Sequence, residues 1–224
     1  MSFRSVSVLL ASATLAASAA AATSWDLASD YAEDTNPNGA WTYGAIPNGT
    51  FSALAWNAGT SSYGVAAVGE TFIYKRTASG TDFGIAFGKV SLEADWGNPA
   101  VRWTAPMAGT YAFTVAVGGS TESGPGGFGN NFASLAGVKL NGIDQVADGI
   151  VDNVKSWTFT ATLATGGTVD TYVMNPGFAL GGNTQTDISV SAVPEPASAL
   201  LLALGMGGLA LRQRQRATAA LTTA

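Results

Sequence analysis

The chain has 224 residues, of which 47% are hydrophobic and 11% charged, and its formal net charge is −5. It contains no cysteine and no histidine, which excludes disulfides, thiolate chemistry, and the commonest zinc ligand and general base. Most of the arginines lie in the end segments, so residues 23–193 carry 6 basic and 14 acidic side chains, a net charge of −8. That balance excludes nucleic acid as an expected partner, because phosphates are bound by clustered lysine and arginine.

Residues 1–22 have the features of a secretory signal peptide. Arg4 supplies the positive charge, residues 6–17 form the apolar segment, and Ala20 and Ala22 are the small residues that a signal peptidase requires. We expect a helical signal segment that is cleaved after Ala22. A first transmembrane helix is the alternative, but the apolar segment is shorter than the roughly 20 residues that span a bilayer.

Residues 23–192 are expected to form one domain of short strands. Asn36-Pro37-Asn38-Gly39 and Ile46-Pro47-Asn48-Gly49 are turn sequences, and the segments 41–43, 51–56 and 71–75 have the composition of strands. The clearest strand covers residues 111–117, where one face is apolar at every second position.

The second half of this region continues the pattern. Residues 118–131 form a glycine-rich segment that lacks the Gly-Lys-Ser/Thr ending of a phosphate loop. Asn141-Gly142 predicts a hairpin turn within 138–143, and further strands are expected at 157–163, 169–173 and 187–190. Because no long helical periodicity interrupts these strands, the fold class is mainly β, a single antiparallel β-sandwich of the jelly-roll kind.

Residues 101–111 read Val-Arg-Trp-Thr-Ala-Pro-Met-Ala-Gly-Thr-Tyr. This segment resembles a strand entry of exported jelly-roll domains such as carbohydrate-binding modules, in which an Asn-Gly hairpin and a Gly-x-Val-Asp strand, here Gly167 to Asp170, also recur. The resemblance implies a β-sandwich and a polysaccharide partner. Many such domains carry His-Pro-Gly before the tryptophan strand, where this chain has Asp95-Trp96-Gly97, so no role of that histidine carries over.

Calcium is the one cofactor that the residues suggest. Asp144, Asp148 and Asp152 recur at every fourth position, and Asp26 and Asp187 could meet if the first and last strands pair. Calcium prefers several oxygen ligands, although this spacing is not that of an EF-hand. The alternative is that these are solvated acids in turns.

Exposed aromatic side chains would indicate sugar binding, and Trp56 and Trp96 are the best candidates because both stand beside polar residues. The alternative is that both are partly buried; Trp103 and Trp157 are expected in the core. The acids are too scattered to select a catalytic pair, so we do not expect an enzyme. Ice binding would require more than the single short row of Thr158, Thr160 and Thr162.

The C-terminal tail has three parts in a fixed order. Pro194-Glu195-Pro196 breaks any strand or helix, because proline lacks the N–H group and has a fixed φ. Residues 197–211 are apolar and uncharged and are expected to form a transmembrane helix, which Arg212, Arg214 and Arg216 would stop on the cytoplasmic side. Residues 217–224 would then be a disordered cytoplasmic tail. An ordinary membrane anchor is the alternative.

This tail resembles the PEP-CTERM sorting signal of exported bacterial proteins, which is also known as an ice-binding protein C-terminal domain although nothing in it indicates ice binding. The resemblance, over residues 193–216, implies processing by an exosortase-like membrane enzyme after transient anchoring in the inner membrane. It implies a structural or adhesive protein of the cell surface, extracellular matrix or biofilm. A carbohydrate-binding module or carbohydrate-active enzyme is the alternative.

Overall fold

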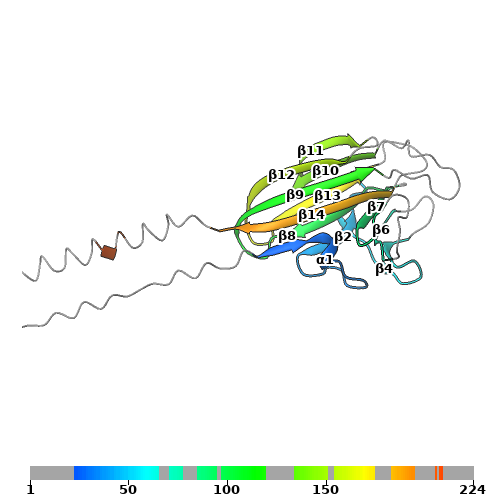
Figure 1. The fold of residues 1–224 in the computed structure, drawn as a ribbon, viewed down its shortest axis with the longest axis horizontal. Coiled ribbons are helices and arrows are strands. Elements are labelled where there is room, and N and C mark those ends of the chain that lie inside the picture. Colours follow the sequence, from blue (N-terminus) through cyan, green and yellow to red (C-terminus); the bar gives the residue numbers. More distant parts are fainter. Residues whose placement is uncertain are drawn as a thin grey trace, which may run out of the picture.

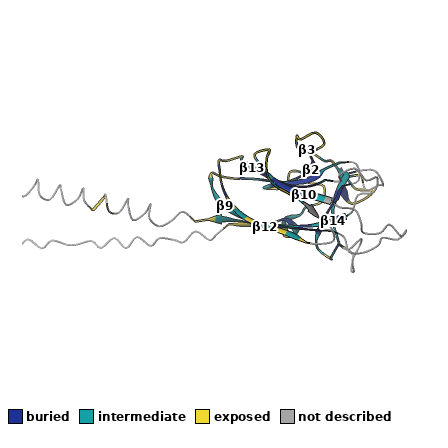
Figure 2. Ribbon diagram, turned by 90° about the horizontal axis from the view of Figure 1, so that it is seen from above, coloured by how far each residue is buried: buried dark blue, intermediate teal, exposed yellow. Residues whose placement is uncertain are grey.

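The computed structural model shows two antiparallel sheets stacked face to face (Figure 1). It describes residues 23–65, 71–77, 85–94, 97–119, 134–150, 154–174 and 183–194, together with the single residues Gly205, Gly207 and Gly208. Figure 2 shows the sheets as two layers with buried residues between them. The expected mainly β, antiparallel sandwich is confirmed.

Sheet A contains eight of the described strands. Seven follow one another in the order β12 (Lys155–Leu163), β9 (Gly109–Gly119), β14 (Asn183–Val193), β7 (Val90–Ala94), β6 (Thr71–Lys75), β5 (Ser62–Gly64) and β4 (Trp56–Asn57). The eighth strand, β1 (Ser24–Asp26), pairs with the C-terminal half of β14, on the same side as β7. The first and last strands of the described domain are therefore neighbours.

Sheet B contains six described strands. Their order is β11 (Ile143–Ile150), β10 (Ser134–Leu140), β13 (Thr168–Met174), β8 (Pro99–Thr104), β2 (Trp41–Ala45) and β3 (Ser52–Ala53). The β10–β11 hairpin turns at Asn141 and Gly142, which both have positive φ (49° and 82°) as a two-residue Asn-Gly turn requires. A four-residue helix, α1 (Leu27–Asp30), follows β1.

The core lies between the sheets and follows the two-residue period of the strands. On β9 the expected face of Tyr111, Phe113, Val115 and Val117 is buried. Trp103 on β8 is also buried, and its ring meets those of Tyr111 and Phe113 edge to face at 4.7 and 5.3 Å. Trp157, expected in the core, is only half-buried because β12 lies at the edge of sheet A.

Two segments differ from expectation. Residues 51–56 do not form one strand, because the chain crosses there from β3 in sheet B to β4 in sheet A. Residues 143–150 form strand β11 instead of a turn that carries acids. In both cases pairing with the neighbouring strand (β3 with β2, β4 with β5, β11 with β10) decides the conformation, and the pattern of the segment alone does not contain that information.

Candidate functional site

The last strand ends directly at the first proline of the tail. β14 pairs with β9 as far as Val193, which lies opposite Thr110, and Pro194 follows as exposed coil. β1 lies beside this point, since the N–H of Ala192 donates to the carbonyl of Thr23 at 2.9 Å. The two ends of the described domain therefore leave the sandwich at the same end (Figure 1).

Most of the residues expected to direct export and sorting lie outside the described part of the chain. These are Ala20, Ala22, Glu195, Pro196, Arg212, Arg214 and Arg216. Inside the expected span, Gly205, Gly207 and Gly208 have helical conformation. Within the described ranges, no helix has the length and apolar character needed to cross a membrane. The signal helix and the transmembrane helix at 197–211 remain predictions.

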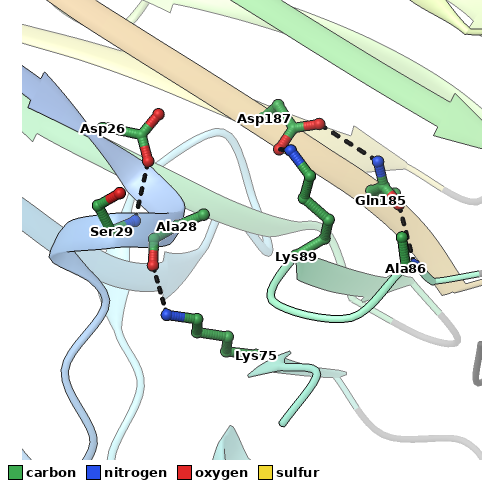
Figure 3. Close-up of polar contacts among 8 residues, drawn as sticks. All are labelled: Asp26, Ala28, Ser29, Lys75, Ala86, Lys89, Gln185 and Asp187. Carbon is green, nitrogen blue, oxygen red and sulfur yellow. Dashed lines mark hydrogen bonds and ion pairs between the residues drawn. The ribbon is translucent and has the colours of Figure 1, made fainter. Parts of the chain in front are cut away.

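Asp26 and Asp187 lie on the two paired end strands, as the sequence suggested, but each is engaged elsewhere (Figure 3). The Asp26 carboxylate caps α1 by accepting the Ser29 N–H at 2.8 Å. Asp187 forms an ion pair with Lys89 at 2.8 Å and accepts from the Gln185 amide at 3.2 Å. The Asp187 carboxylate is therefore already paired with a cationic ammonium.

The other calcium candidates are spread along β11. Asp144 accepts hydrogen bonds from the Lys139 ammonium and the Tyr172 hydroxyl, both at 2.8 Å, and these two donors lower the pKa of its carboxyl. Asp148 lies opposite Ala136, and Asp152 is outside the described residues. In the part of the chain that the structure describes, no group of three or more acidic side chains could hold a metal ion.

The two tryptophans proposed to bind sugar have different outcomes. Trp56 on β4 is half-buried and packs edge to face on Tyr63 with ring centroids 5.1 Å apart, and its role in sugar binding stays a prediction. Trp96 lies outside the described residues.

Sequence reasoning did not identify a set of side chains on the outer face of sheet A. Ile73 of β6 and Leu92 of β7 belong to the core, so their neighbours in each strand point away from it. Strand register places the outward residues in two rows across β6, β7 and β14. We call them the outer patch: Phe72, Glu93 and Asn183 in one row, and Tyr74, Ser91 and Gln185 in the next.

The outer patch combines aromatic rings with polar groups. The rings of Phe72 and Tyr74 lie side by side with centroids 5.8 Å apart, and Ser91 Oγ lies 3.1 Å from Asn183 Oδ1. Glu93 is 5% exposed, and burial raises the pKa of Tyr74 to about 12. Carboxylate, amide and hydroxyl groups beside aromatic rings are typical of sites that bind polar ligands with apolar faces. Ser91 and Glu93 are buried here, so the half-exposed rings and the amides of Asn183 and Gln185 are the parts that a ligand would reach. In the sequence, the alternation of Phe72 and Tyr74 around Ile73 was the signal that could have indicated this patch.

Comparison with known families identifies the tail. Residues 192–215 match the PEP-CTERM protein-sorting motif. The match begins one residue before the expected segment and includes the last two residues of β14. The PEP-CTERM motif implies an exported protein whose C-terminal tail anchors it in the membrane.

A search of curated proteins finds no match to this chain. Solved structures that resemble it include a family 35 carbohydrate-binding module from Clostridium thermocellum (TM-score 0.31, 17% identity, covering 54% of this chain and 90% of the module). Another is the carbohydrate-binding module CBM36 in complex with calcium and xylotriose (TM-score 0.33, 15% identity, 56% and 92%). A third is an exo-beta-1,3-galactanase from Phanerochaete chrysosporium (TM-score 0.33, 12% identity, 68% and 30%). Similarities this low assign neither a ligand nor an activity to the present chain.

Proposed function

We propose that this chain is an exported β-sandwich protein that an exosortase-like enzyme processes at its PEP-CTERM motif and that serves a structural or adhesive role in the cell envelope or extracellular polysaccharide. The observation that carries the proposal is the position of the motif, which begins on the last two residues of the last strand of a folded domain. A signal peptide cleaved after Ala22 completes the export route.

Intact-mass analysis of the protein recovered from cells and medium of its native host tests this role. The wild-type mass should correspond to a chain that starts near Thr23 and ends near Pro194. Glu195→Ala should retain the tail and stay in the membrane fraction, whereas Glu33→Ala, which removes an exposed acid far from the motif in sequence, should be processed normally. An uncut tail in the wild-type protein would show a simple anchored envelope protein instead.

The outer patch favours carbohydrate binding as a second function. Its paired rings of Phe72 and Tyr74 lie in rows with amide, hydroxyl and carboxylate groups. Binding to the host's own exopolysaccharide, measured by affinity electrophoresis, should weaken at least about tenfold in Phe72→Ala/Tyr74→Ala if these rings supply the stacking surface. Met107→Ala, which truncates an exposed apolar residue elsewhere, is the matched control. Equal retention of both variants would exclude the patch as the binding surface.

A structural calcium ion stays a prediction, and it would have to use residues outside the described ranges or displace Lys89 from Asp187. Thermal unfolding with and without a chelator tests for it, because a lower unfolding temperature after chelation would establish a structural calcium ion. The absence of catalytic activity stays a prediction.

A further inference from the structure

Strand β12 forms one long edge of sheet A. Nine consecutive residues pair with β9, from Lys155 opposite Val117 to Leu163 opposite Gly109, without any shift in register. No other described strand lies along its second edge. Among the described residues, the backbone N–H and C=O groups on that side have no strand partner, and an edge of this kind can pair with another extended chain.

The other edges of the two sheets carry features that discourage such pairing. β4 and β3 are two residues long. β11 carries Asp144 and Asp148, and its register with β10 shifts between Val138 and Lys139. Short edges, charges and bulges are the usual means by which proteins prevent association between sheets. β12 has neither proline nor glycine, and its one charged residue is Lys155 at the start.

The inward side chains of β12 are incompletely covered. Trp157 and Phe159 pack against the core but remain half-buried, while the outward Ser156, Thr158, Thr160 and Thr162 are exposed (Figure 2). Phe159 stacks on Phe113 across the β9–β12 pair, with ring centroids 5.0 Å apart and planes 10° apart. A further strand along this edge would cover both half-buried rings, which favours pairing because cross-strand aromatic contacts stabilise sheets.

The sequence of β12 is complementary to itself when two copies run antiparallel about Phe159. Trp157 then lies opposite Ala161 of the second copy, which pairs a large side chain with a small one. Thr158 lies opposite Thr160, and Lys155 lies opposite Leu163, so no like charges meet. Phe159 lies opposite Phe159 and extends the aromatic row that begins at Phe113. Inward residues face inward residues throughout, as antiparallel pairing requires.

We propose that β12 is an assembly surface that pairs with β12 of a second copy of this chain, antiparallel about Phe159, so that the two A sheets become one. This goes beyond sorting and adhesion and depends on neither. The partner is this chain itself because the complementary sequence is its own and because the edge is nearly uncharged within a domain of net charge −8.

Disulfide cross-linking tests this register directly, because the chain contains no cysteine. In the proposed pair, Thr158→Cys and Thr160→Cys face each other across the interface, where Cα atoms lie about 5 Å apart and a disulfide fits. Either substitution alone places the two thiols two residues out of register, with Cα atoms about 8 Å apart, beyond disulfide reach. Ser189→Cys on β14, exposed in the interior of sheet A, is the control.

The full chain in detergent micelles would be oxidised mildly and analysed on non-reducing gels. We expect the double variant Thr158→Cys/Thr160→Cys to form covalent dimer at least about tenfold more than either single variant or Ser189→Cys. No dimer from the double variant, or as much dimer from Ser189→Cys, would overturn the proposal. Circular dichroism of each variant establishes that it is folded.

Charge variants provide a second, independent readout from native mass spectrometry. Thr158→Lys/Thr160→Lys places like charges opposite each other on exposed positions and should lower the dimer fraction at least about tenfold. Thr158→Lys/Thr160→Glu carries as many charges but places opposite signs across the interface, and it should keep the dimer. Equal dimer fractions in the wild type and both variants would overturn the pairing.

Discussion

Asp170, on the outer face of sheet B, shows how one buried charge is stabilised. Its side chain is 2% exposed and accepts two hydrogen bonds from Arg102, from Nε at 2.6 Å and Nη2 at 2.9 Å. The ring of Phe51 lies 4.0 Å from the guanidinium carbon. The bidentate geometry and the aromatic cover both depend on the planar guanidinium, which lysine cannot replace.

Arg102→Ala should therefore destabilise the domain more than an ordinary surface substitution. It leaves the Asp170 carboxylate buried without its cation, and the expected loss in the free energy of unfolding is about 3–5 kcal/mol. Arg102→Lys should recover less than half of that loss. Urea unfolding of both variants measures these losses in the free energy of unfolding.

Lys139→Ala serves as the comparison, because its partner Asp144 is 56% exposed and solvent screens that pair. Its cost should stay below about 1 kcal/mol. Equal losses for Arg102→Ala and Lys139→Ala would show that burial of Asp170 does not control the energy of its ion pair.

The sequence predicted some of these residues but not their roles. Asp170 appeared as the last residue of a Gly-x-Val-Asp resemblance, yet nothing local indicated that Arg102 lies opposite it, 68 positions earlier. The outer patch was missed for the same reason, because β6, β7 and β14 join distant segments. Asp26 and Asp187 were correctly placed on paired strands, but their partners Ser29 and Lys89 could not be foreseen.

Among elements, those with strict alternation were predicted best. The face of β9 and the β10–β11 turn agree with expectation because period and turn chemistry are local properties. Segments whose neighbours determine them were predicted worst, as in the division of residues 51–56 between two sheets. β12 was recognised as a strand, but its position at an edge is a property of the sheet and not of the segment.

Gly137 on β10 provides a prediction about strand packing. A Cβ atom there would lie 2.5 Å from the Tyr172 hydroxyl and 2.6 Å from the Val146 carbonyl oxygen, on the two flanking strands. Since backbone on one side cannot move without disturbing β11, Gly137→Ala should lower the free energy of unfolding by about 1–3 kcal/mol. Ala136→Gly, which removes a buried methyl group from the same strand, is the comparison variant. Gly142→Ala is unsuitable, because Gly142 has a positive φ and its substitution would add backbone strain to any effect of packing.

Thermal unfolding monitored by circular dichroism measures both variants. Tyr172→Phe should restore only a small part of the stability lost in Gly137→Ala, because the new methyl group would still lie 2.6 Å from the ring carbon Cζ and from the Val146 carbonyl oxygen. If Gly137→Ala matched the wild type in unfolding temperature, the close packing of Tyr172 over β10 would be contradicted.

The stability of the whole molecule should depend on pH mainly at the acidic and alkaline ends of the range. It lacks histidine and cysteine, so no side chain has an ordinary pKa between the carboxylates and the tyrosines. At the alkaline end, burial raises the pKa of Tyr74 to about 12 and is also the main cause of raised pKa values at Tyr31, Tyr43, Tyr63 and Tyr172.

A raised pKa means that the folded state holds its proton more tightly than the unfolded state does. The stability from these phenols is therefore complete below pH 10, the unfolded value, and is lost as the pH rises toward 12. We expect a nearly constant free energy of unfolding from pH 6 to about 9 and a steep decline above about pH 10. Tyrosinate absorbance at alkaline pH should rise together with loss of β-sheet signal; free titration of all six tyrosines in a folded protein would contradict this.

β14 lies in the interior of sheet A, with β9 and β12 on one side and β7, β6, β5 and β4 on the other. It is also the last strand before the sorting motif. A chain that is threaded outward from its N-terminus delivers this strand last, so the two halves of the sheet have no common partner until the motif itself arrives. If the chain is exported in this direction, sheet A can be completed only after β14 has crossed the membrane, and β14 crosses together with the start of the sorting motif.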